Sequence, residues 1–134
     1  MARELPACTN IVFFGLDEPL AGELEGVLSD PGRAVVARPL CSVSECREMI
    51  DGLGPDLVFC PAEGRHYRVL LEAARQAGSA LPVVVVSRRP QVSEWLDALE
   101  DGAADYCAAP FETIQMRWIL DTCLGSRKGF VATG

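Results

Sequence analysis

The side chains that could carry chemistry in this sequence are few and lie far apart. His66 is the only histidine, and it lies in a polar segment with no second histidine to share a metal ion with it. Asp17 stands before a helix-period run, where a carboxylate typically caps a helix. Ser87 follows four consecutive valines, where a hydroxyl commonly satisfies nearby backbone groups. With Glu63, which we expect in a solvated loop, these residues predict no metal site and no catalytic cluster.

Six cysteines are many for a chain of 134 residues. No two of them have the Cys-x-x-Cys spacing that zinc sites usually show. Cys60 and Cys107 lie in apolar strand-like runs, and Cys123 lies in an apolar helix-like run. We therefore expect reduced, buried thiols that act as small hydrophobic side chains.

The composition is that of one globular domain. The chain is 49% hydrophobic, which is enough for a sizeable core, and its formal net charge is −7. A negative balance argues against binding to nucleic acid or to an anionic membrane, because both need clustered lysines and arginines. Residues 1–10 lack the apolar core of a signal peptide, and Leu81–Val86 is too short to span a bilayer. We expect a soluble cytoplasmic protein.

The elements that must position these residues alternate between short β-branched runs and helix-period runs. The expected strands are 11–14, 34–37, 57–60, 83–86 and 106–108. The expected helices are the segment from Asp17 to Leu28, then 42–52, 69–77, 95–101 and 114–124. Ser42 and Glu45 form a capping box, Pro61–Arg65 is expected to be a loop, and glycines 78, 102 and 125 are expected to end the last three helices.

Five alternating strand and helix units predict an α/β fold with a doubly wound parallel sheet. Val83–Val86 indicates burial on both faces, as in the centre of such a sheet. Five units in this length suggest the flavodoxin-like strand order 2-1-3-4-5. We expect one domain over residues 10–125, an N-terminal extension over 1–9, and a tail or the start of a linker over 126–134.

Five segments resemble the receiver domain of bacterial response regulators, the CheY-like family. The segments are Leu16–Leu20, Pro55–Val58, Leu81–Ser87, Ala98–Tyr106 and Pro110–Phe111. The resemblance covers about residues 10–125. It implies the flavodoxin-like fold and a place in two-component phosphorelay signal transduction.

The resemblance also locates a phosphorylation site, and most of that site is missing here. In the family, two adjacent carboxylates and an acceptor aspartate bind Mg²⁺, and a lysine and a hydroxyl hold the transferred phosphoryl group. The acidic pair falls on Leu16 and Asp17, the acceptor on Pro61, the lysine on Ala109 and the hydroxyl on Ser87. Because the acceptor, the lysine and half of the acidic pair are lost, we expect no aspartyl-phosphate chemistry, no bound metal and no enzymatic activity.

Three functions remain open at the level of the sequence. The first is a pseudo-receiver that acts through protein–protein interaction, and the second is the receiver part of a longer regulator. The third is a small-molecule-binding domain that uses an apolar pocket over Leu16, Pro61 and Ala109 at the strand C-termini. The acidic first loop, Gly15–Pro19, disfavours flavin or nucleotide phosphates, so we expect no cofactor.

The last helix contributes to an expected partner surface. Met116, Leu120 and Cys123 follow the spacing of a core-facing stripe. Ile114 and Trp118 lie away from the centre of that stripe, where a solvated helix would carry polar residues. These two side chains therefore predict a contact with another protein.

The fourth helix and fifth strand complete that expected surface. Leu96 and Leu99 are the expected core pair of the helix, with Trp95 beside them toward solvent. Tyr106 lies on the intervening strand. In the family that the chain resembles, the fourth helix, fifth strand and fifth helix mediate dimerisation or output, so we expect a partner or self-association there. The alternative is that both tryptophans fold over the rim of the core.

Overall fold

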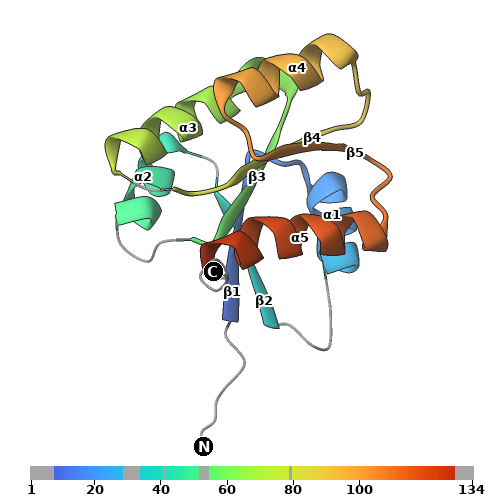
Figure 1. Ribbon diagram of the computed structural model, residues 1–134, viewed down its shortest axis with the longest axis horizontal. Coiled ribbons are helices and arrows are strands. Elements are labelled where there is room, and N and C mark those ends of the chain that lie inside the picture. The colour runs from blue at the N-terminus through green and yellow to red at the C-terminus, as the bar shows by residue number, and fades with distance from the viewer. Residues whose placement is uncertain (1–7, 29–33, 41, 52–54, 79, 129–134) are drawn as a thin grey trace, which may run out of the picture.

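The structure, a computed structural model, describes residues 8–28, 34–40, 42–51, 55–78 and 80–128. Five strands alternate with helices along the chain (Figure 1). The strands are β1 Cys8–Phe14, β2 Ala34–Leu40, β3 Leu57–Pro61, β4 Val83–Ser87 and β5 Asp105–Ala108. The helices are α1 Glu18–Leu28, α2 Val43–Asp51, the short 3₁₀ helix η1 Glu63–Arg65, α3 Tyr67–Gln76, α4 Val92–Asp101 and α5 Thr113–Lys128.

The strands form one parallel sheet in the order β2-β1-β3-β4-β5, the order that the sequence predicted. In such a sheet the carboxyl ends of all strands meet at one edge. The segments that follow β1, β3 and β4 therefore come together, although they are far apart in the sequence. This edge is where the resemblance placed the phosphorylation site.

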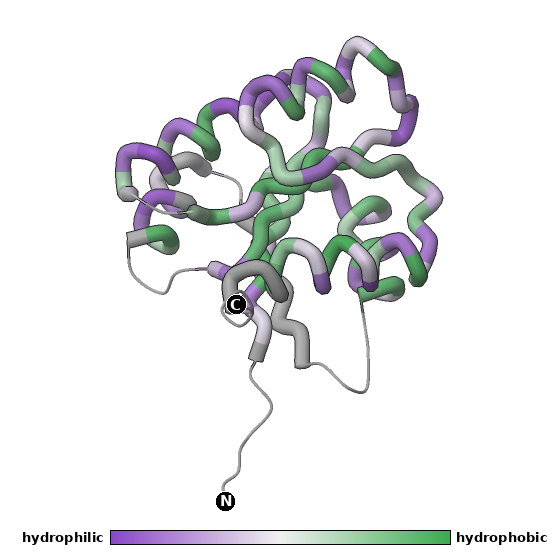
Figure 2. Tube along the Cα trace, in the orientation of Figure 1, coloured by the Kyte–Doolittle hydropathy of each residue, from purple (hydrophilic) through white to green (hydrophobic). Residues whose placement is uncertain are grey.

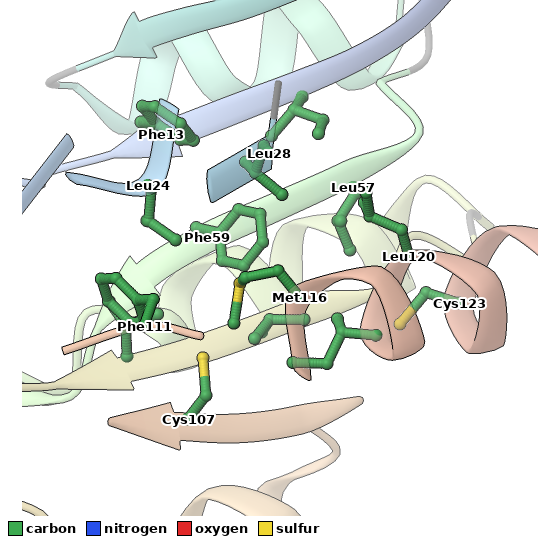
Figure 3. Packing of buried hydrophobic residues seen from close by; sticks show 14 of the residues in the cluster. Phe13, Leu24, Leu28, Leu57, Phe59, Cys107, Phe111, Met116, Leu120 and Cys123 are labelled. Atoms are coloured by element: carbon green, nitrogen blue, oxygen red, sulfur yellow. The ribbon is translucent and has the colours of Figure 1, made fainter. Parts of the chain in front are cut away.

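Two hydrophobic layers enclose the sheet. Residues of α1 and α5 pack on one face, where Phe13 and Phe59 meet edge to face with ring centroids 6.0 Å apart (Figure 3). Residues of α3 and α4 pack on the other face with Val12 and Phe14. Val83–Val86 is fully buried, which confirms the central position of β4.

The predicted helix caps are present. The backbone N–H of Leu20 donates to Asp17 Oδ1 at 2.9 Å, so Asp17 caps α1. In the capping box of α2, the Glu45 N–H donates to Ser42 Oγ at 3.1 Å and the Ser42 N–H donates to Glu45 Oε1 at 3.3 Å. Gly102 ends α4 in the left-handed conformation, with φ +111°.

Several predicted boundaries are wrong. α5 continues through Gly125 to Lys128, because an interior glycine costs only about 1 kcal/mol relative to alanine and does not by itself end a packed helix. β1 begins at Cys8, before the expected strand start at residue 11. Pro61 was expected in a loop but ends β3. Residues 1–7 and 129–134 of the expected extension and tail lie outside the described residues.

The predicted core of the last two helices is only partly right. Met116, Leu120 and Cys123 are buried as expected, and Ile119 joins them. On α4, however, Leu96 and Leu99 are exposed, and Ala98 occupies the core instead, fully buried. The outward side of α4 is therefore more apolar than the periodicity alone suggested.

Candidate functional site

A hollow of about 340 Å³ lies at the carboxyl edge of the sheet. The segments after β1, β3 and β4 supply its walls. Its lining residues are Gly15, Asp17, Leu20, Pro61, Glu63, Gly64, His66, Val86, Ser87 and Arg88. Charged side chains thus come together from three loops.

The Asp17 carboxylate and the Arg88 guanidinium form a bidentate ion pair in this hollow. Arg88 Nη1 donates to Asp17 Oδ2 at 2.7 Å, and Arg88 Nη2 donates to Asp17 Oδ1 at 2.9 Å. The Arg88 hydrogen bonds, and after them the Leu20 N–H, lower the pKa of the Asp17 carboxyl to about 2. Both oxygens of the Asp17 carboxylate are therefore occupied by groups of the chain itself.

Arg88 is the functional residue that the sequence reasoning missed. It directly follows Ser87 at the end of β4, so the parallel sheet places it at the same edge as Asp17. This position directly after a strand could have revealed Arg88 from the sequence, because the residues that follow the strands of a parallel sheet lie at the same edge. Arg88 supplies a positive charge at an edge where the family lysine position is Ala109.

Of the other expected site residues, Ser87 and Pro61 line the same hollow as the ion pair, whereas Leu16 and Ala109 do not. Ser87 is buried, and its Oγ accepts a hydrogen bond from the Arg89 N–H at 3.1 Å, as expected for a strand-end hydroxyl. Pro61 lines the hollow. Leu16 and Ala109 are partly buried and pack against the core on the α1–α5 face.

An apolar pocket was expected over Leu16, Pro61 and Ala109, and this hollow does not have that lining. Of the three, only Pro61 lines the hollow, because Leu16 and Ala109 pack against the hydrophobic core. Asp17 and Arg88 contribute charges to its wall in their place. This charged wall does not suit an apolar ligand.

Glu63 and His66 stand at the mouth of the hollow, and both are exposed. The loop between them turns through Gly64, at φ +74°, where an added Cβ would lie 2.8 Å from His66 Nε2. Among the residues that the structure describes, no group of three His, Cys, Asp or Glu side chains could hold a metal ion.

Helix α4 presents an apolar stripe to solvent. Val92, Trp95, Leu96 and Leu99 recur at the spacing of one helix face and are 68%, 42%, 49% and 38% exposed. Figure 2 shows hydrophobic residues recurring along this helix. Of these four, sequence reasoning had directed only Trp95 toward solvent.

Beside the buried Ala98, acidic side chains of α4 bond to α3 and to the loop before it. Asp97 Oδ2 accepts from Arg65 Nη2 at 3.1 Å, and Asp101 Oδ2 accepts from Arg68 Nε at 2.7 Å. The Tyr67 hydroxyl also donates to Asp101 Oδ2, at 3.4 Å. These contacts orient the helix, and they account for the outward direction of its leucines.

Tyr106 reaches the same helix from β5. Its ring is half-buried against the core on the α3–α4 side, and its hydroxyl donates to the Glu94 carboxylate. Burial, and after it the hydrogen bond to Glu94, raises the pKa of the Tyr106 hydroxyl. Tyr106 is therefore bonded to α4 and only partly available to a partner.

Ile114 and Trp118 are exposed on α5, at 81% and 59%. α5 covers the opposite face of the sheet from α4 (Figure 1). The expected surface is therefore divided into two parts. Trp95 belongs to the exposed stripe on α4, whereas Ile114 and Trp118 form an exposed pair on α5. The strand β5 lies between the two helices.

No family model and no curated protein sequence matches the chain. Solved structures do match it. A signal receiver domain from Vibrio parahaemolyticus has a TM-score of 0.74 at 13% identity, covering 91% of this chain and 94% of that one. NtrX from Brucella abortus, solved in complex with ADP, has a TM-score of 0.72 at 25% identity, covering 91% of this chain and 27% of that one. An atypical orphan response regulator with a phosphorylation-independent regulatory mechanism has a TM-score of 0.65 at 23% identity, covering 87% of this chain and 96% of that one.

These neighbours define the class of structure: the chain has the flavodoxin-like receiver fold of response regulators. Within the described residues, no helix is long and apolar enough to cross a membrane.

Proposed function

We propose that the chain is a cytoplasmic, non-phosphorylatable receiver-like module that signals through protein–protein contacts in a bacterial two-component-type pathway. The observation that carries this proposal is the two-pronged Asp17–Arg88 ion pair at the carboxyl edge of the sheet. Pro61 and Ala109 stand where the resemblance implies the acceptor aspartate and the lysine. The Asp17 carboxylate is thus paired with an arginine of the chain itself.

The chemistry of the edge supports this proposal. A proline has no nucleophilic side chain, so Pro61 cannot attack phosphorus. Mg²⁺ needs oxygen ligands, and both oxygens of Asp17 already accept from Arg88, one of them also from Leu20. A cation at Asp17 would have to displace a guanidinium whose hydrogen bonds hold the pKa of that carboxyl at about 2.

The proposed output surface comprises α4, β5 and α5. Support comes from the exposed Trp95 and Trp118, since tryptophan is the residue type most enriched at the energetic centres of interfaces. The two tryptophans belong to different faces of the sheet, so the surface offers two contact areas.

Phosphorylation is tested with acetyl phosphate and Mg²⁺, followed by intact-mass measurement. We expect no added phosphoryl group on the chain, while a receiver that has its acceptor aspartate, treated in parallel, gains one. A stoichiometric adduct that hydroxylamine removes would overturn the proposal.

The same assay applies to Pro61→Asp. We expect this variant to remain unmodified, because Leu16 and Ala109 still leave the phosphoryl charge poorly compensated and Arg88 still occupies Asp17.

A further inference from the structure

Four exposed residues cross the mouth of the carboxyl-edge hollow between two buried ones. Ala62, directly after β3, is buried, and its N–H donates to the Val86 carbonyl on β4 at 2.9 Å. Tyr67, the first residue of α3, is 1% exposed. The residues between them, Glu63–His66, are all exposed, and three of the four line the hollow. We call the segment Glu63–His66 the strap.

The backbone of the strap is strained at Arg65. Gly64 has φ +74°, and Arg65 follows it with φ +55°. In the part of the chain that the structure describes, Arg65 is the only non-glycine residue with a positive φ. In such a residue the left-handed backbone is less populated than the right-handed one by roughly tenfold. A strained residue of this kind persists only where its surroundings hold it, and switch segments are a common place for one.

The Arg65 side chain holds the strap on helix α4. Its Nη2 donates to Asp97 Oδ2 at 3.1 Å, and the two side chains are 51% and 39% exposed. Among the described residues, no other side chain of the strap bonds to a neighbouring element. An ion pair this exposed favours its own geometry by no more than about fivefold. The backbone strain and the ion pair therefore oppose each other with similar size, so a second arrangement of the strap lies close in free energy.

The His66 imidazole packs on the left-handed turn of the strap. A Cβ added to Gly64 would lie 2.8 Å from His66 Nε2 and 2.9 Å from His66 Cδ2. Glycine is therefore the residue that fits at position 64 while the ring is in this place. The position of the ring depends on the turn that Arg65 completes, so the environment of His66 changes when the strap rearranges.

We propose that the strap is a two-state device, which α4 holds closed through the Arg65–Asp97 ion pair. The structure shows the closed arrangement, with Glu63 and His66 at the mouth of the hollow. In the open arrangement Arg65 takes a right-handed backbone, its guanidinium leaves Asp97, and the His66 ring leaves Gly64. The mouth of the hollow then widens, so the position of α4 controls access to the hollow. This inference goes beyond the proposed function and holds whether or not the chain accepts a phosphoryl group.

The first test removes the charge that holds Arg65 and observes His66 by NMR at one fixed pH. His66 is the only histidine, so its imidazole signals are unambiguous. Gly64→Ala provides the reference for the open arrangement, because its Cβ would meet the His66 ring. In Asp97→Asn we expect the imidazole signals to move toward that reference. Glu100→Gln is the matched control, because it makes the same change at an exposed position of α4 that has no bond to the strap.

The second test separates the backbone strain from the ion pair. Arg65→Gly and Arg65→Ala both remove the ion pair, but only glycine adopts φ +55° without strain. We expect the ratio of open to closed strap, measured from the His66 signals, to be roughly tenfold higher in Arg65→Ala than in Arg65→Gly. In an unstrained loop the order would be the reverse, because glycine gives the chain more conformational freedom.

Any of three results would overturn the inference. The first is a set of His66 signals that Asp97→Asn leaves unchanged, and the second is an equal change in Glu100→Gln. The third is an Arg65→Ala strap that is no more open than that of Arg65→Gly. Circular dichroism establishes that each variant is folded. If Asp97→Asn does not fold, added salt replaces it, because screening of the exposed pair should open the wild-type strap, and unchanged His66 signals would then refute the device.

Discussion

Asp17 joins two loops that follow different strands. Its carboxylate caps α1 through the Leu20 N–H and binds Arg88, which lies 71 residues away in the loop before α4. In the family that the chain resembles, this carboxylate belongs to the metal site. Here Asp17 connects the first helix to the loop before the fourth, so one residue links the carboxyl edge of the sheet to the proposed partner surface.

The two roles of Asp17 can be separated by substitution. Asp17→Asn keeps a good helix cap but removes the charge, and we expect a loss of no more than about 1 kcal/mol because the pair is exposed. Asp17→Ala also removes the cap and should cost about 1 kcal/mol more. Urea unfolding measures both. Equal stability of the two variants would contradict the capping role.

The ion pair also predicts a pH dependence. The pKa of Asp17 is lowered to about 2, so the pair stabilises the fold above the unfolded-state pKa of about 3.9. That stabilisation is lost as the pH falls through the folded-state pKa. The stability difference between the wild type and Asp17→Asn should therefore shrink from about pH 4 toward pH 2. A difference that stays constant over this range would show that Arg88 does not hold the carboxylate in its charged form.

At the scale of the element, α4 shows how polar contacts orient a helix with two apolar sides. Its hydrophobic residues alone favour burial of Leu96 and Leu99. Asp97 and Asp101 are instead drawn toward the arginines before and on α3, and Glu94 toward Tyr106. The leucines are then turned outward.

The orientation of α4 predicts that a substitution at the buried Ala98 destabilises the fold, whereas a substitution at the exposed Leu96 does not. Ala98→Leu inserts a larger side chain into a fully buried site and should cost about 1–3 kcal/mol. Leu96→Gln changes an exposed position and should alter the monomer's stability by no more than about 0.5 kcal/mol. Denaturant unfolding at one fixed, low protein concentration measures both. A larger loss for Leu96→Gln would mean that Leu96 is a core residue.

At the scale of the whole molecule, the sheet keeps the buried thiols apart. Cys60 and Cys107 lie on β3 and β5 with β4 between them, and they belong to the hydrophobic layers on opposite faces. Cysteines 60, 107 and 123 form no disulfide with any described residue. Cys41 lies outside the described residues, and the side chains of Cys8 and Cys46 are not described.

These three thiols should be protected from alkylation until the domain unfolds. Burial raises the pKa of Cys107 to about 12 and that of Cys123 to about 11, so little thiolate forms at neutral pH. A short iodoacetamide pulse followed by peptide mapping should label Cys60, Cys107 and Cys123 only in denaturant. Rapid labelling of any of them in the native protein would show that its hydrophobic layer opens locally.

The sequence alone determined the elements and their order, because the signals for them are local. Four consecutive valines define β4, Ser42 and Glu45 cap α2, and Gly102 ends α4. The resemblance added the positions at which a receiver would carry its phosphorylation site. Gly125 shows the limit of local signals, because α5 continues past it.

The tertiary structure alone decided which residues face each other. Arg88 and Asp17 meet because parallel strands bring distant strand ends to one edge, and no local pattern encodes that pairing. The outward face of α4 depends on arginines supplied by α3 and the loop before it, so its own periodicity could not settle whether Leu96 or Ala98 is buried. Hydrophobic spacing shows that a helix has an apolar side, but the contacts that neighbouring elements offer decide where that side points.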